Sequence, residues 1–114
     1  MGNRLVGYGA YLPSRVMTNS DFERIMDTTD EWIVTRTGIR ERHIARDNES
    51  VAEMATIAAQ QALSNANLTI DDIDMLIVAT TTPELDFPSV GVQILGRLGA
   101  TKNQPHVYKL RMGY

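Results

Sequence analysis

A long capped helix that leads into an apolar strand narrows the possible folds of this chain. Ser50 is placed as the N-cap of a helix that runs to Ala66, with an apolar stripe along one face. The continuous apolar run from Met75 to Ala79 is typical of a parallel strand covered on both faces. An earlier apolar segment, Arg4 to Ala10, predicts a first buried strand. Strand, helix and strand together predict a right-handed βαβ unit in an α/β protein.

Three shorter elements complete the predicted organisation. Asn19 or Ser20 is expected to cap a short helix with one apolar face that carries Phe22, Ile25 and Met26. The residues from Ile39 to Ala45 are expected to be extended. Pro88 is placed as the first residue of a helix that runs to Leu98, with Gly99 just past its end.

The stretch from Asp27 to Arg42 contains the residues that most suggest a ligand site. Asp30 is the expected N-cap of a helix, and Gly38 is the left-handed residue that ends it. Trp32 and Arg36 stand four residues apart, so both project from one face. An indole beside a guanidinium can hold a planar, phosphorylated ligand by stacking and by charge. The spacing leaves open a simpler alternative, a surface cation–π pair or a Trp that anchors the helix to a core.

Composition excludes several kinds of site. The 114 residues include no cysteine, which excludes disulfides, thiolate metal sites and thiol nucleophiles. His43, His106 and the acidic residues from Asp71 to Asp74 lack the spacing of metal ligands, so no metal site is expected. The net charge of −3 argues against nucleic-acid binding. Without an apolar run of about 20 residues or a signal-peptide core, we expect a cytoplasmic protein with no membrane contact.

Several continuous segments of the sequence resemble those of one protein family. They are DTTDEWIVTRTGIRERHIA (Asp27 to Ala45), IVATTTPELDFPS (Ile77 to Ser89), and Tyr11-Leu12-Pro13 followed by Thr18-Asn19. In order and spacing they are similar to the N-terminal part of β-ketoacyl-acyl carrier protein synthase III, the condensing enzyme that starts fatty acid synthesis. The resemblance covers about Arg4 to Gly99. It implies an incomplete N-terminal part of a thiolase-like α/β fold, with a βαβ core and a helical cap segment.

The resemblance also implies roles for four residues. Trp32 would stack on the adenine of coenzyme A, Arg36 would meet its phosphates, and Thr28 would belong to the same binding site. Phe87 would reach across a homodimer interface and line the acyl pocket of the partner subunit. The alternative for Phe87 is a hydrophobic staple that packs on its own helix. The implied substrates are acyl-coenzyme A and an acyl carrier protein, and no further cofactor is implied.

A basic run has two open interpretations. Arg36, Arg40, Arg42 and Arg46 are opposed only by Glu41 along this stretch. The patch could meet an acidic carrier protein or the phosphates of coenzyme A, or it could be a solvated face.

Around Ala100 the resemblance ends. The family continues into a strand that delivers a Cys nucleophile, and its His and Asn follow later; this chain has none of the three at such positions. We therefore expect no catalytic residue, one partial thiolase-like domain over residues 1–100, and a divergent tail over residues 101–114. An out-of-frame reading of the nucleophile strand is our hypothesis for that tail.

Two functions follow from this pattern. The favoured one is a truncated synthase that is inactive by itself, because condensation needs a thiolate and oxyanion donors. The alternative is a non-enzymatic interaction module that pairs with a full-length or split synthase.

Overall fold

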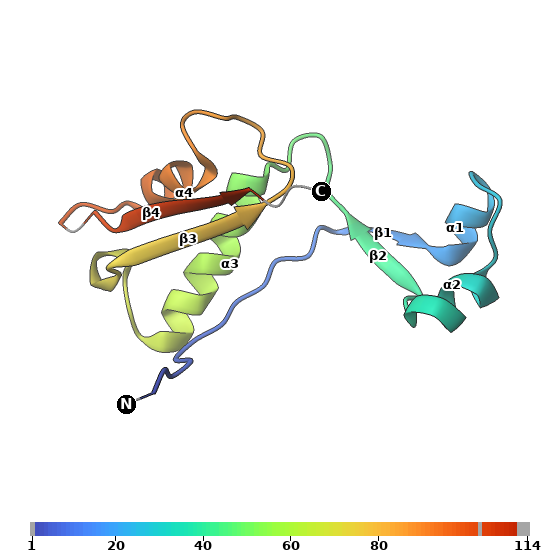
Figure 1. The fold of residues 1–114 in the computed structure, drawn as a ribbon, viewed down its shortest axis with the longest axis horizontal. Coiled ribbons are helices and arrows are strands. Elements are labelled where there is room, and N and C mark those ends of the chain that lie inside the picture. The colour runs from blue at the N-terminus through green and yellow to red at the C-terminus, as the bar shows by residue number, and fades with distance from the viewer. Residues whose placement is uncertain (1, 103, 112–114) are drawn as a thin grey trace. The chain divides into compact units, whose positions relative to one another are not determined.

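Residues 2–102 and 104–111 are described in the computed structural model shown in Figure 1. The chain forms two units, one of Leu12–Glu49 and one of Met1–Tyr11 with Ser50–Tyr114.

The larger unit contains a βαβ arrangement, but only one of its two strands is a predicted one. The predicted unit joined the strand expected from Arg4 to Ala10 with the strand expected from Met75 to Ala79, whereas the observed unit joins the latter to a strand of the tail. β3 (Met75–Thr80) and β4 (His106–Arg111) pair in parallel, and α4 (Val90–Leu98) connects them. Ile77 lies opposite Tyr108 in the register. The second strand of the unit therefore comes from the tail, where no strand was expected. The origin of the tail stays a prediction, and residues 103 and 112–114 of it lie outside the described residues.

The predicted strand from Arg4 to Ala10 is wrong. This segment has no strand partner in the described structure and instead runs beside α3 (Val51–Ala66), as Figure 1 shows in blue and green. The side-chain amide of Asn65 donates to the carbonyl of Tyr8 at 2.9 Å, and the Ala10 amide donates to Gln61 Oε1 at 2.8 Å. The backbone of this segment therefore forms hydrogen bonds with side chains of α3 and not with the backbone of a neighbouring strand.

The predicted helix from Ser50 to Ala66 is confirmed. Ser50 is the N-cap of α3, and its hydroxyl accepts from the Glu53 amide at 3.0 Å. α3 packs against α4, where Ala52, Val90 and Ile94 form the buried core of the unit.

Within residues 2–102 and 104–111 only one face of β3 is covered, so the prediction of a strand buried on both faces is wrong. Leu76 and Val78 are half-buried and pack against the core. On the other face Met75 and Ile77 are 51% and 57% exposed. Gly91 in α4 lies so close to the side chains of β3 and β4 that a Cβ there would meet Val107. The described helices therefore cover one side of this sheet.

The ends of α4 and the turn before β3 follow local chemistry. Ser89 is the N-cap of α4, so the predicted start at Pro88 is wrong by two residues, whereas Gly99 ends the helix with φ 72° as predicted. A 3-10 turn, Ile70–Asp72, precedes β3. Within it Asp71 accepts from the amides of Thr101 and Lys102, both at 3.1 Å. The Asp71 carboxylate therefore holds the loop between α4 and β4 in place.

The smaller unit consists of a two-stranded antiparallel sheet and two short helices. Its elements, in chain order, are β1 (Arg15–Thr18), α1 (Asn19–Glu23), α2 (Asp30–Thr37) and β2 (Glu41–Ile44). The extended segment predicted around β2 is confirmed.

The caps of these helices differ by one residue from the prediction. Thr18, and neither Asn19 nor Ser20, caps α1, because Thr18 and Asp21 satisfy each other's backbone amides in a reciprocal capping box. α1 ends at Glu23, so the predicted apolar face does not extend to Ile25 and Met26, which are exposed.

In α2 the N-cap is Thr29 and not Asp30. The Thr29 hydroxyl accepts from the Trp32 amide at 3.1 Å. Gly38 ends the helix with φ 71°, as predicted.

Candidate ligand site around Trp32

α2 presents Trp32 and Arg36 side by side on its surface. The guanidinium carbon of Arg36 lies 4.7 Å from the centre of the indole ring, which confirms the contact predicted from their spacing. Trp32 is 55% exposed and α2 has no buried residue. The indole therefore does not anchor the helix in a core, and one part of the simpler alternative is wrong. What stays open is whether the pair is a bare surface contact or a binding site.

Two open depressions share the indole of Trp32. The first, of about 370 Å³, is lined by Thr29, Glu31, Trp32, Thr35 and Arg36. The second, also of about 370 Å³, is lined by Met26, Asp27, Thr28, Thr29 and Trp32. The structure thus brings together all three residues predicted to bind coenzyme A, with Trp32 common to both depressions. A flat ring system has room to stack on this indole.

The charge of Arg36 is available to a ligand. Among the described residues Arg36 forms no ion pair, and its one recorded partner is the indole. Glu31 lines the same depression and carries the opposite charge. A phosphate that meets Arg36 therefore also meets a nearby carboxylate, which weakens the attraction.

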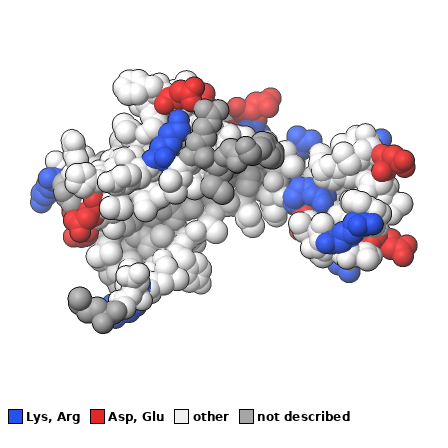
Figure 2. Space-filling view, in the orientation of Figure 1, with Lys and Arg blue, Asp and Glu red and all other residues white. Residues whose placement is uncertain are grey.

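One arginine of the predicted basic run is held by contacts within the smaller unit. Arg42 is half-buried, and its guanidinium donates to the carbonyl of Met17 at 3.1 Å and to Asn19 Oδ1 at 2.8 Å. Its guanidinium carbon also lies 4.5 Å from the centre of the Phe22 ring. Lys and Arg form separate areas on the face drawn in Figure 2. Arg42 thus stabilises the smaller unit through these contacts.

Asn19 is a buried residue of the same unit whose role the sequence did not predict. Its side chain is 1% exposed. Nδ2 donates to Asp30 Oδ1 at 2.7 Å and to the carbonyl of Ile39 at 2.9 Å, and Oδ1 accepts from Arg42. Its position directly after Thr18 is the signal that the sequence offers. The prediction that Asn19 itself caps α1 is wrong, because Thr18 is the cap.

Phe87 lies in the loop between β3 and α4 and is 90% exposed. The alternative of a hydrophobic staple on its own helix is therefore wrong. Its proposed place in a partner's acyl pocket stays a prediction.

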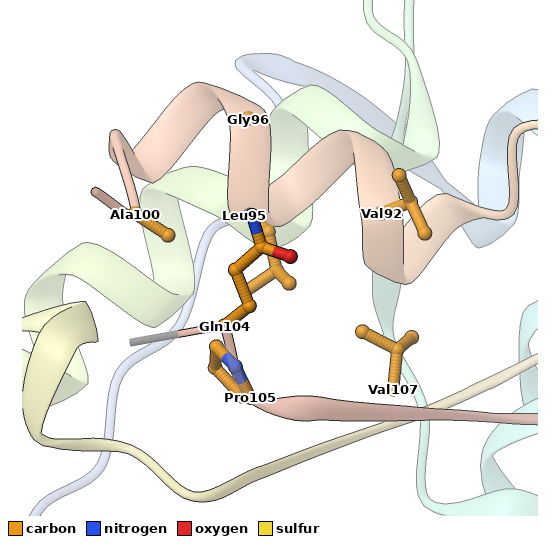
Figure 3. Close-up of a pocket in the computed structure, with 7 residues that line it drawn as sticks. All are labelled: Val92, Leu95, Gly96, Ala100, Gln104, Pro105 and Val107. Carbon is orange, nitrogen blue, oxygen red and sulfur yellow. The ribbon is translucent and has the colours of Figure 1, made fainter. Parts of the chain in front are cut away.

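A third hollow, drawn in Figure 3, lies between α4 and the start of β4. It measures about 340 Å³ and is lined by Val92, Leu95, Gly96, Ala100, Gln104, Pro105 and Val107. Gln104 supplies its one polar side chain among those drawn, and none of the described residues that line it is titratable.

Two kinds of feature are absent from the described residues, a metal-binding cluster and a membrane-spanning helix. Residues 2–102 and 104–111 contain no group of three His, Asp or Glu arranged to hold a metal ion. In the same part of the chain, no helix is both long and apolar enough to cross a bilayer.

Several known proteins are similar to this chain in sequence. No protein-family profile matches the chain. The β-ketoacyl-[acyl-carrier-protein] synthase III of Thiobacillus denitrificans is 55% identical over 103 residues, which are 90% of this chain and 32% of the relative. Synthase III 1 of Vibrio cholerae is 56% identical over 99 residues, 87% of this chain and 31% of the relative.

Solved structures agree with these sequences. The crystal structure of 3-oxoacyl-[acyl-carrier-protein] synthase III from Aquifex aeolicus matches with a TM-score of 0.88 and 43% identity, over 97% of this chain and 35% of that one. The synthase III structure from Thermus thermophilus gives 0.84 and 41%, over 97% and 34%. The chain spans about a third of the length of these relatives, and it belongs to the β-ketoacyl-acyl carrier protein synthase III family as an N-terminal piece of its thiolase-like fold.

Proposed function

We propose that this chain is a coenzyme A-recognising part of a cytoplasmic synthase III and does not catalyse condensation by itself. The observation that carries the proposal is the exposed pair of Trp32 and Arg36, with Thr28 beside the same indole. The indole offers a stacking face to adenine, and the guanidinium offers charge to phosphate.

Catalysis fails for a chemical reason. Transfer of an acyl group from coenzyme A to an enzyme needs a nucleophile that attacks the thioester carbonyl and releases the coenzyme A thiol. The chain contains no cysteine to act as that nucleophile. Acyl-coenzyme A would therefore bind without being consumed, and an acyl carrier protein would find no acyl group to extend.

Binding is expected to be weak. Stacking and phosphate contact supply about 1–3 kcal/mol before the entropy cost of association, so the expected dissociation constant is about 10 mM or weaker. Glu31 beside Arg36 lowers the affinity further.

A titration with coenzyme A tests the proposal. Trp32 is the only Trp of the chain, so its fluorescence reports on this site alone. The wild-type signal should change only at about 10 mM ligand and above, and calorimetry of Trp32→Ala with Arg36→Ala should show no binding. Arg40→Ala is the matched control: it removes an exposed arginine outside both depressions and should bind as the wild type does.

Two results would overturn the proposal. One is coenzyme A affinity that survives the loss of both Trp32 and Arg36. The other is a covalent acyl adduct, detected by mass spectrometry after incubation with acetyl-coenzyme A, or ketoacyl product formed with malonyl-acyl carrier protein.

A second candidate function is pairing with the rest of a synthase. The observation that favours it is the uncovered apolar face of the β3–β4 sheet, where Ile77 and Tyr108 are 57% and 54% exposed. Phe87 adds a third exposed apolar side chain in the same unit.

Complementation distinguishes the two functions. The chain is co-expressed with a Cys-containing remainder of a synthase III, and ketoacyl product is measured. Pairing predicts activity that Ile77→Glu abolishes and that Ile57→Glu, a matched change on α3, leaves in place. Absence of any complex between the two pieces would rule out this second function.

A further inference from the structure

We infer that Asn19 is a positioning residue: it holds α2 so that Trp32 and Arg36 face a ligand together. The inference rests on the proposed function of that pair, and it concerns a residue that touches neither the indole nor Arg36 in any recorded contact.

The bonds of Asn19 join three segments of the smaller unit. Nδ2 donates to Asp30, the first residue of α2, and to the carbonyl of Ile39, just after the Gly38 that ends α2. Both ends of one helix are therefore tied to a single amide nitrogen. Oδ1 accepts from Arg42 in β2, and the Asn19 amide donates to the carbonyl of Arg40 at 3.1 Å.

α2 has few other ties within the unit, one of them the Asp30 amide that donates to Glu23 Oε1 at 2.6 Å. The helix is eight residues long and has no buried residue. Isolated helices of this length are marginal in water, so tertiary contacts must hold them. In Leu12–Glu49 the buried residues are Pro13 and Asn19. A polar side chain thus takes the place that an apolar core would fill.

The hydrogen bonds of Asn19 are not those of a helix cap. Thr18 already caps α1, and every recorded side-chain bond of Asn19 leaves α1. Both amide hydrogens and the amide oxygen are used, and the described residues contain no buried side-chain polar atom without a partner. Loss of this amide would leave the Asp30 carboxylate and the Ile39 carbonyl short of a donor.

A swap of the two partners tests the link. Asn19→Asp places a carboxylate against Asp30 and removes both donors. Asp30→Asn alone keeps an amide oxygen that can accept, so its effect should be small. In Asn19→Asp with Asp30→Asn, the amide at position 30 can donate to the carboxylate at position 19, so the link to the start of α2 is rebuilt in reverse, whereas the Ile39 carbonyl still lacks its donor.

Two readouts follow these variants. Hydrogen exchange reports how firmly the α2 amides are held, with the α3 amides in the other unit as an internal reference. Coenzyme A titration reports the alignment of Trp32 and Arg36. Asn19→Asp should lower α2 protection about tenfold and weaken coenzyme A affinity about fivefold, with α3 unchanged. The double variant should regain part of both losses, because the bond to Asp30 is replaced and the bond to the Ile39 carbonyl is not.

Asn48→Asp is the matched control, since Asn48 is exposed in a turn of the same unit and the charge change is identical. It should stay within about twofold of the wild type on both readouts. Wild-type protection of α2 in Asn19→Asp, or a double variant no better than the single one, would overturn the inference. If the wild type binds no coenzyme A, the proposed function fails, while hydrogen exchange still decides whether Asn19 positions α2.

Discussion

Arg42 stacks on Phe22, with its guanidinium carbon 4.5 Å from the ring centre, and donates to the carbonyl of Met17 and to Asn19 Oδ1. Arg36, six residues earlier, also lies over an aromatic ring, but its one recorded partner is the exposed Trp32. The same pairing of side chains therefore has two uses in one unit. Arg42 joins β2 to β1 and α1, whereas Arg36 keeps its charge available.

Arg42→Lys should destabilise the smaller unit by about 1–3 kcal/mol. A lysine cannot donate to two separated acceptors while lying flat on a ring, so at least one buried acceptor loses its partner. Urea unfolding followed by hydrogen exchange of the β2 amides measures the loss. Arg40→Lys, at an exposed position, is the control and should change stability by less than about 0.5 kcal/mol. Equal effects of the two changes would contradict this account of Arg42.

Features set by neighbouring residues could be predicted from the sequence. Gly38 and Gly99 end their helices in the left-handed region, and Ser50 caps α3, because each depends on chemistry within a few positions of the chain. The pairing of Trp32 with Arg36 was predictable for the same reason, since helical spacing alone brings the two together.

Features set by distant partners could not be predicted. The segment from Arg4 to Ala10 has the composition of a strand, but a strand needs a ladder partner, and here the side chains of α3 take the backbone bonds. The burial of Asn19 depends on Asp30, Ile39 and Arg42, which lie 11 to 23 positions along the chain. No local pattern encodes that convergence.

Gly9→Ala should detach the N-terminal segment from α3. A Cβ at Gly9 would collide with the carbonyl oxygen of Ala58 and lie 2.7 Å from the amide nitrogen of Ala62, and neither backbone atom can move without bending the helix. The expected cost is about 1–3 kcal/mol, in the range of other overpacking changes. Loss of hydrogen-exchange protection at the Ala10 amide measures it. Gly2→Ala, where a Cβ meets nothing within 4 Å, should leave that protection unchanged.

Asp21 should make the smaller unit sensitive to acid. The amide of Thr18, and secondly its hydroxyl, hold the pKa of the Asp21 carboxyl below its ordinary value of 3.8. Because the folded-state pKa is lowered, this stabilisation is present above the unfolded-state pKa and is lost as pH falls through the folded value. The stability advantage of wild type over Asp21→Asn should therefore be constant near neutral pH and shrink below about pH 4. Unfolding of both proteins at several pH values tests this, and an advantage that does not shrink as the pH falls below about 4 would contradict it.

Glu31→Gln should strengthen binding of coenzyme A. Glu31 lines the same depression as Arg36, so its carboxylate repels the phosphates that the guanidinium attracts. The change keeps the shape of the side chain and removes the repulsion, at the cost of one favourable charge in the first turn of α2. Affinity measured by Trp32 fluorescence should rise about two- to fivefold at low salt, and the gain should fade as added salt screens the charges. Glu41→Gln, an exposed change in β2 outside both depressions, is the control and should leave the affinity unchanged. A gain that ignores salt, or equal gains from both variants, would show that the phosphates do not lie beside Arg36.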